Sequence, residues 1–173
     1  MKPEAPIAYG IERLASHHDR AAFVSGVAAL DRYLKEQAGQ DARRHVAAPF
    51  VLVRRDSGVV VGFYTLSATA IRLAGLPPAL ANQLPKYPLV PATLLGRLAV
   101  DHREGGKRLG EFLLLDALHR SHELSLQIAS AAVVVEALDN RASAFYRRYE
   151  FVQFPASPHR LFLPMKTIRE LFA

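Results

Sequence analysis

The stretch Leu95–Gly110, LGRLAVDHREGGKRLG, constrains the fold of this chain more than any other. It begins as an apolar run typical of a buried strand, passes through a charged turn and two glycines, and opens a helix that continues as EFLLLDALHRSHEL. The helix, expected from Lys107 to about Leu124, carries a broad apolar stripe that must lie on a sheet. A continuous apolar strand over Ala131–Ala137 follows. A strand, helix and strand of this length predict a right-handed parallel crossover.

The turn at Gly105–Gly110 predicts an anion site. The first N–H groups of a helix have no partner inside the helix, and the helix dipole adds partial positive charge at the same end. Lys107 and Arg108 place two full positive charges there. A phosphate-bearing ligand is the expected guest, although a plain turn with a solvated basic edge has the same sequence signature.

Length and composition bound the possible functions. The chain of 173 residues has the length of a single domain, residues 1–173. It has no apolar run of roughly 18 residues and no apolar leader segment, so we expect neither a membrane span nor a signal peptide. The absence of cysteine excludes disulfides, thiolate metal sites and a cysteine nucleophile, and fits a cytoplasmic protein. The net charge of +6 favours a polyanionic partner over a merely basic surface.

The other expected elements complete an α/β pattern. Before the central stretch we expect a strand over Pro6–Leu14, and then a helical region capped at Ser25 and interrupted at Gly39, which forms either two helices or one kinked helix. A hairpin of Phe50–Arg55 and Val59–Ser67, continuing toward Ile71, comes next. A proline-rich loop over Leu76–Pro91, with a short helix over Pro78–Leu84, leads into the central stretch. After it we expect a helix from Asp139–Asn140, strands over Phe151–Phe154 and Arg160–Leu163, and a helix over Met165–Phe172. The order predicts one mixed sheet, antiparallel first and parallel at the crossover.

Two motifs within this order resemble the GNAT superfamily of N-acetyltransferases. The six residues Gly105–Gly110 stand where that family has its pyrophosphate loop, with Gly105 in place of the usual Arg or Gln and Arg108 in place of the first glycine. The segment Asp139–Phe151, DNRASAFYRRYEF, resembles the family's closing signature, with Glu150 where glycine is usual, so we expect strain in that turn. The resemblance implies the acyl-CoA N-acyltransferase fold, a mixed central sheet with helices on both faces.

Within the superfamily, four segments resemble TacT-like toxins of toxin–antitoxin pairs: FVSGVAALDRYLKEQAGQD, GFYTLSA, LGRLAVD and AFYRRYEF. This resemblance implies transfer of an acetyl group from acetyl-CoA to the α-amine of aminoacyl-tRNA, which blocks translation. It also implies a homodimer and a ribbon–helix–helix antitoxin. A housekeeping N-acetyltransferase of a small amine or protein N-terminus is the alternative, and a degenerate fold serving as an interaction module is a third.

The resemblance also assigns roles to residues. The backbone of Leu98 and Val100 would hold the pantetheine arm, one amide would face the acetyl oxygen with Leu98 as its catalytic candidate, and Tyr146 would protonate the departing thiolate. The full set of expected cofactor-binding residues is Leu98, Ala99, Val100, Gly105, Gly106, Lys107, Arg108, Leu109, Gly110, Glu111, Asn140, Ser143 and Phe145.

Basic and histidine residues give weaker indications. Exposed cations are expected to contact tRNA phosphates, with Arg97 beside the active strand as the first candidate and Arg43, Arg44, Lys86 and Arg148 as the others. No general base stands out, because His102 and Glu104 belong to a loop expected to be exposed. The histidines, including His17–His18 and the pair His119 and His122, lack a carboxylate that would complete a familiar zinc motif, so no metal is expected.

Overall fold

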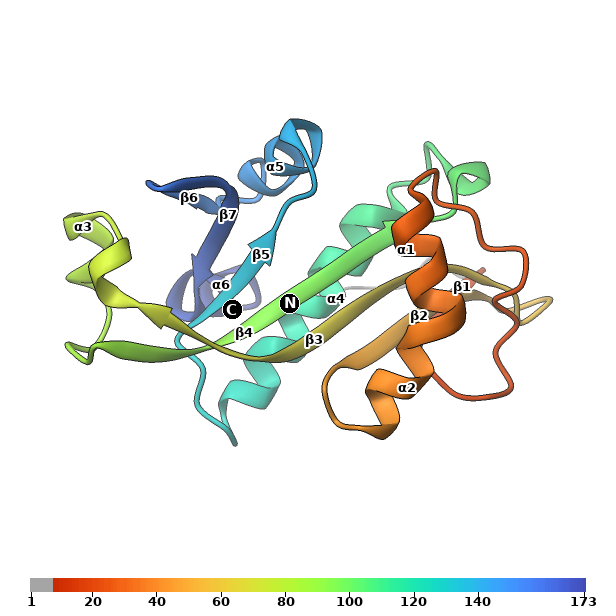
Figure 1. The fold of residues 1–173 in the computed structure, drawn as a ribbon, viewed down its shortest axis with the longest axis horizontal. Coiled ribbons are helices and arrows are strands. Elements are labelled where there is room, and N and C mark those ends of the chain that lie inside the picture. Colours follow the sequence, from red (N-terminus) through yellow and green to blue (C-terminus); the bar gives the residue numbers. More distant parts are fainter. Residues whose placement is uncertain (1–7) are drawn as a thin grey trace. The chain divides into compact units, whose positions relative to one another are not determined.

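The computed structural model describes residues 8–173, which form a mixed seven-stranded sheet with helices (Figure 1). The strand order is β1-β2-β3-β4-β5-β7-β6. The strands are β1 (Tyr9–Arg13), β2 (Ala48–Arg54), β3 (Val60–Arg72), β4 (Leu89–Val100), β5 (Ala132–Glu136), β6 (Val152–Phe154) and β7 (Ser157–Pro164). The helices are α1 (Ala28–Arg32), a π-helical segment (Tyr33–Gln37), α2 (Ala38–Arg43), α3 (Pro78–Ala81), α4 (Leu109–Ser125), α5 (Asn140–Arg147) and α6 (Met165–Leu171), with 3₁₀ turns at Leu73–Gly75 and His102–Glu104.

The predicted element order is therefore confirmed for the described residues; Pro6 and Ile7 of the expected first strand lie outside them. Two compact units divide the described chain. The N-terminal unit contains residues 8–67 and 96–117, and the C-terminal unit contains residues 68–95 and 118–173. Strands β3 and β4 and helix α4 contribute residues to both units. None of the helices within residues 8–173 has the length and apolar character needed to cross a membrane.

The N-terminal unit covers its part of the sheet on both faces. Strands β2 and β3 pair antiparallel, and Gly58, at φ +71°, closes the hairpin by donating its N–H to the Arg54 carbonyl at 2.8 Å. Phe63 packs in a core cluster with Tyr33 of the helical run and Ala99 of β4. Gly62 points to the other face, where an added Cβ would lie 3.0 Å from Cδ1 of Leu113 in α4. This confirms the predicted arrangement of helices on both faces.

The C-terminal unit contains the parallel step of the crossover. Thr93–Leu95 of β4 pair with Val133–Val135 of β5 in parallel, whereas β5 pairs antiparallel with β7, and β7 with β6. Strand β5 is buried at four of its five positions, as its unbroken apolar sequence predicted. A core cluster with Ile71, Val134 and Phe162 holds this unit together.

The first helical region differs from the expectation in two respects. The N-cap of α1 is Val27, not Ser25, and its side chain makes no cap hydrogen bond. Ser25 instead closes the preceding turn, because its hydroxyl donates to Asp31 at 2.6 Å and accepts the Val27 N–H at 3.1 Å. The irregularity is not at Gly39 but in the π-helical segment Tyr33–Gln37, so the run forms one helix with a local insertion.

Two element boundaries also differ. Strand β4 already begins at Leu89, so Pro91 lies inside a strand; it stands near the strand's start and its carbonyl accepts the Ala131 N–H at 2.8 Å. Helix α4 begins at Leu109 rather than at Lys107. The reason is that Arg108 has φ +57°, a left-handed conformation through which a right-handed helix cannot continue.

Candidate functional site

The reacting strand segment expected at Leu98–Val100 is the last part of β4. The parallel pairing with β5 spans Thr93–Leu95 of β4, and β4 runs on to Val100. Leu98 and Val100 are half-buried, while Ala99 between them is buried in the core of the N-terminal unit. Because the pairing register with β5 ends at Leu95, the backbone of Leu98 and Val100 lies beyond the parallel ladder, which is what the assignment of these two residues requires.

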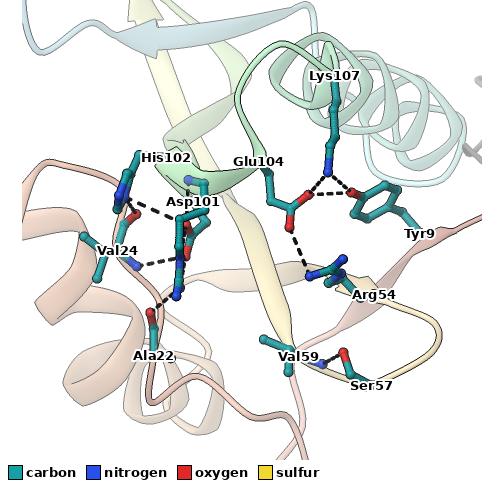
Figure 2. A network of polar contacts seen from close by, with 11 residues as sticks. Tyr9, Ala22, Val24, Arg54, Ser57, Val59, Asp101, His102, Glu104 and Lys107 are labelled. Atoms are coloured by element: carbon teal, nitrogen blue, oxygen red, sulfur yellow. Dashed lines mark hydrogen bonds and ion pairs between the residues drawn. The ribbon is translucent and has the colours of Figure 1, made fainter.

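Asp101 fixes the turn that follows this strand (Figure 2). Its buried carboxylate accepts the Val24 N–H at 3.1 Å, the Arg103 N–H at 2.9 Å, and two bonds from the Arg103 guanidinium at 2.9 and 2.7 Å. The guanidinium bonds are the main cause that holds the pKa of Asp101 far below its usual range. Asp101 is therefore a structural anion and not a base.

Glu104 is buried, which corrects the expectation of an exposed loop. Figure 2 shows its carboxylate between Lys107, whose Nζ lies 2.6 Å away, the Tyr9 hydroxyl, and Arg54, whose Nη1 lies 3.4 Å away. The hydrogen bonds from Lys107 and then from Tyr9 lower the pKa of Glu104. A carboxylate held ionised by two hydrogen bonds and an ion pair is a poor proton acceptor, so Glu104 is not suited to act as a base.

The two cations of the turn at Gly105–Gly110, Lys107 and Arg108, each have an acidic partner. Lys107 is bound to Glu104, and Arg108 places Nε 2.7 Å from Oε2 of Glu111. Both pairs have i,i+3 spacing, a signal that is visible in the sequence. The two full positive charges expected here are therefore partly balanced by neighbouring carboxylates.

The backbone of the turn at Gly105–Gly110 remains suited to an anion. The Phe112 N–H makes the first hydrogen bond of α4, to the Arg108 carbonyl at 3.1 Å, so the N–H groups of residues 109–111 precede the helical ladder. Gly106, at φ +79°, is exposed, and an added Cβ would meet no atom within 4 Å. Leu109 is buried, and Gly105 is exposed. An exposed helix end of this kind fits a pyrophosphate.

Tyr146 belongs to the C-terminal unit, on α5. The helix is capped by Asp139, whose carboxylate accepts the Ala142 N–H at 2.8 Å. Tyr146 is buried beside Phe151, with ring centroids 5.5 Å apart, and burial raises its pKa. The side chain therefore keeps its proton at neutral pH, the form that a general acid needs. Glu150, with φ +70°, has the strained left-handed conformation that the sequence predicted.

The remaining expected ligand contacts on α5 already have partners. Oδ1 of Asn140 lies 2.8 Å from Nε2 of His159, and the buried Ser143 hydroxyl donates to the Pro158 carbonyl at 3.2 Å. Phe145 is half-buried, 5.6 Å from the guanidinium of Arg148. A role for these side chains in binding acetyl-CoA stays a prediction.

The basic candidates differ in their surroundings. Arg43 and Arg44 end α2 in the N-terminal unit, and Lys86 and Arg148 are exposed in the C-terminal unit. Arg97 is half-buried, with its guanidinium carbon 3.6 Å from the ring centroid of Tyr33. Sequence reasoning did not single out Tyr33, because the π-helical segment that places it cannot be recognised from apolar spacing.

One cluster of residues 8–173 has the composition of a metal site: Glu12, His17 and His18. The Ala15 N–H donates to Nδ1 of His18 at 2.9 Å, so the proton of the neutral ring lies on Nε2. That Nε2 is 2.7 Å from Glu12 and donates to it. Both ring nitrogens of His18 therefore have partners within the protein, and the arrangement is that of a hydrogen-bonded histidine.

Comparison with known proteins gives matches along nearly the whole chain. A tRNA-acetylating toxin of Mycobacterium tuberculosis is 37% identical over 159 residues, which are 92% of this chain and 93% of that protein. A probable toxin TacT of Sinorhizobium fredii is 32% identical over 163 residues, 90% of each chain. No protein-family model matches the sequence.

Solved structures of related toxins also superpose on nearly the whole chain. A tyrosine-to-phenylalanine mutant of KacT superposes with a TM-score of 0.88 at 31% identity, covering 95% of this chain and 99% of that one. AtaT complexed with acetyl-methionyl-tRNAfMet has the same TM-score at 29% identity and the same coverage. An AtaT mutant bound to acetyl-CoA and to the C-terminus of the antitoxin AtaR has a TM-score of 0.82 at 26% identity, covering 96% and 99%. By sequence and by fold, the chain belongs to the family of TacT-, AtaT- and KacT-like tRNA-acetylating toxins within the GNAT superfamily.

Proposed function

We propose that this protein transfers the acetyl group of acetyl-CoA to the α-amine of aminoacyl-tRNA and thereby blocks translation. The observation that carries the proposal is the match over 95% of the chain to AtaT in complex with acetyl-methionyl-tRNAfMet, together with the 37% identity to a tRNA-acetylating toxin. The net charge of +6 agrees with a polyanionic substrate.

Acetyl-CoA would bind along the end of β4 and at the start of α4. The N–H groups of residues 109–111 and the open backbone at Gly106 would receive the pyrophosphate, and the backbone of Leu98 and Val100 would align the thioester. One preorganised N–H donor at the acetyl oxygen contributes roughly 3 kcal/mol to stabilisation of the transition state.

The reaction exchanges a C–S bond for a C–N bond. The neutral α-amine attacks the thioester carbonyl, and the Tyr146 hydroxyl gives its proton to the departing sulfur. The proton lost by the amine passes to solvent, which reprotonates Tyr146. The carboxylates of Asp101 and Glu104 are already bound by cations, so no side chain described here is assigned as base. An aminoacyl ester amine has a lowered pKa, which makes solvent an adequate acceptor.

Partners are part of the same proposal. Solved relatives include AtaT with the C-terminus of the antitoxin AtaR and an AtaT–AtaR complex bound to DNA. We extend this to a neutralising antitoxin of the ribbon–helix–helix class, to a homodimer of this chain, and to a cytoplasmic location. Co-expression with the product of an adjacent small gene and light scattering of the purified protein test the first two.

The decisive experiment uses purified full-length protein, labelled acetyl-CoA and bulk aminoacylated tRNA beside a panel of small amines. We expect label in the aminoacyl-tRNA, and we expect Tyr146→Phe to lose it while the affinity for acetyl-CoA stays nearly unchanged. Tyr87→Phe, at an exposed tyrosine, is the matched control and should keep full activity. Label confined to a small amine would favour the housekeeping alternative, and transfer undiminished in Tyr146→Phe would remove that residue as the acid.

A further inference from the structure

The guanidinium of Arg97 rests on an aromatic platform. Its central carbon lies 3.6 Å from the centroid of the Tyr33 ring, within the range at which a cation is attracted to a ring face. Tyr33 cannot move freely, because it is buried and stacks on Phe63 with ring planes 18° apart. Its hydroxyl also donates to Oδ2 of Asp41 at 2.9 Å. The ring is thus fixed from both ends.

A π-helical segment of the backbone places the Tyr33 ring. Tyr33 is the first residue of the π-helical segment that joins α1 to α2, and such insertions are frequent at functional sites. Asp41 lies in α2, beyond the insertion, where Oδ1 also accepts a bond from Gln37 at 2.9 Å. The hydrogen bonds therefore span the insertion and hold the ring over β4.

Arg97 differs from the other cations of the N-terminal unit near the end of β4. Arg103, Lys107 and Arg108 each have a carboxylate partner at 2.6–2.7 Å. Among residues 8–173, the ion pairs found within 4.0 Å do not include Arg97. A guanidinium stacked on a ring keeps its charge and its N–H donors for an anion from outside the protein. Its neighbour in the chain is Leu98, on the reacting strand.

We propose that Arg97 binds a phosphate at the acceptor end of the aminoacyl-tRNA and that Tyr33 is a positioning residue, which holds the guanidinium in place beside the reacting strand. The inference rests on the proposed function, because it assigns the phosphate to that substrate. A ring that fixes the cation before binding lowers the entropy lost when the substrate docks.

The test measures acetylation of aminoacyl-tRNA by full-length variants over a range of salt concentrations. Arg97→Gln should raise the KM for aminoacyl-tRNA about tenfold and reduce the slope of log(kcat/KM) against log[salt] by about one, since one phosphate contact is lost. The KM for acetyl-CoA should not change. Arg97→Lys, which keeps the charge but not the planar stacking, should recover only part of the loss.

Variants of Tyr33 test whether this residue positions the Arg97 guanidinium or only stabilises the fold. Tyr33→Phe keeps the ring and should retain most of the activity, whereas Tyr33→Leu should raise the KM for aminoacyl-tRNA without changing the KM for acetyl-CoA. The double variant Tyr33→Leu/Arg97→Gln should be no worse than Arg97→Gln alone, because both changes remove the same contact. Should Tyr33→Leu fail to fold, two comparisons remain. Arg97→Gln against Arg97→Lys tests whether the planar, stacked cation is needed for tRNA binding, and Tyr33→Phe against the wild type tests whether the ring suffices without the hydroxyl.

The outcomes distinguish the two proposals. Wild-type protein that does not acetylate aminoacyl-tRNA would overturn the proposed function and this inference with it. Wild-type activity on tRNA with an unchanged salt slope in Arg97→Gln would overturn the inference alone. A rise in the KM for acetyl-CoA would assign Arg97 to the cosubstrate and also contradict it. Independent, additive effects of the Tyr33 and Arg97 changes would show that Tyr33 does not act through Arg97.

Discussion

Single residues in this protein carry strain at the positions where the superfamily uses glycine. Arg108 and Glu150 have φ of +57° and +70°, in the left-handed region that costs most residues roughly 1–2 kcal/mol. Both follow from the sequence departures in the pyrophosphate loop and the closing signature. Their side chains are exposed, so no packing contact in the core explains them.

Glu150→Gly should therefore stabilise the fold. We expect the free energy of unfolding to rise by about 1 kcal/mol, because glycine adopts this backbone conformation without a Cβ clash. Urea unfolding followed by circular dichroism measures the change. Glu170→Gly, at an exposed position in α6 with ordinary helical geometry, is the control and should lower stability by about 1 kcal/mol. A loss of stability in Glu150→Gly would mean that the carboxylate makes a contact worth more than the strain.

At the scale of elements, buried carboxylates tie the turn after β4 to the rest of the N-terminal unit. Glu104 joins the turn to β1 through Tyr9 and to β2 through Arg54, while Asp101 joins it to the loop at Val24. These contacts fix where α4 begins, and so where its N-terminal amides stand.

This arrangement predicts a dependence of stability on pH. Because its hydrogen bonds lower the pKa of Glu104 in the folded state, the stability it contributes is present above the unfolded pKa near 4.3 and is lost as the pH falls below that value toward the folded pKa. Glu104→Gln should cost about 2 kcal/mol near pH 7 and clearly less near pH 3. Urea unfolding at both pH values, with the exposed Glu36→Gln as control, measures this. An equal cost at both pH values would contradict it.

At the scale of the whole molecule, two compact units share three elements. Strands β3 and β4 and helix α4 each contribute residues to both units, so neither unit contains the whole of these three elements. The single domain expected from the length of 173 residues predicts that the units unfold together.

Calorimetry of the full chain tests this expectation. We expect one transition, with the calorimetric and van't Hoff enthalpies equal, and coincident melting curves from near- and far-ultraviolet circular dichroism. Two separated transitions would show instead that the units are independent folding units.

Much of this molecule could be predicted from the sequence because the signals are local. Apolar alternation and continuous apolar runs located the strands, and the order of elements with the motifs at Gly105–Gly110 and Asp139–Phe151 carried the resemblance to the GNAT superfamily, which implied the fold. The left-handed turn at Glu150 was also predicted, because a missing glycine is visible in the sequence. The start of α4 could not be predicted from the apolar pattern: the helix begins two residues later than expected, because Arg108 directly before it has a left-handed conformation.

Only the tertiary structure decided the long-range contacts of the site. The contacts of Glu104 with Tyr9 and Arg54 and the stacking of Arg97 on Tyr33 join residues far apart in the chain, and the stacking also depends on a helical insertion that periodicity does not reveal. The sequence determined which charged groups the site contains. Folding brought distant partners to some of these groups, Tyr9 and Arg54 to Glu104 and the Tyr33 ring to Arg97, because electrostatic attraction depends on distance in space and remote residues meet only in the tertiary structure.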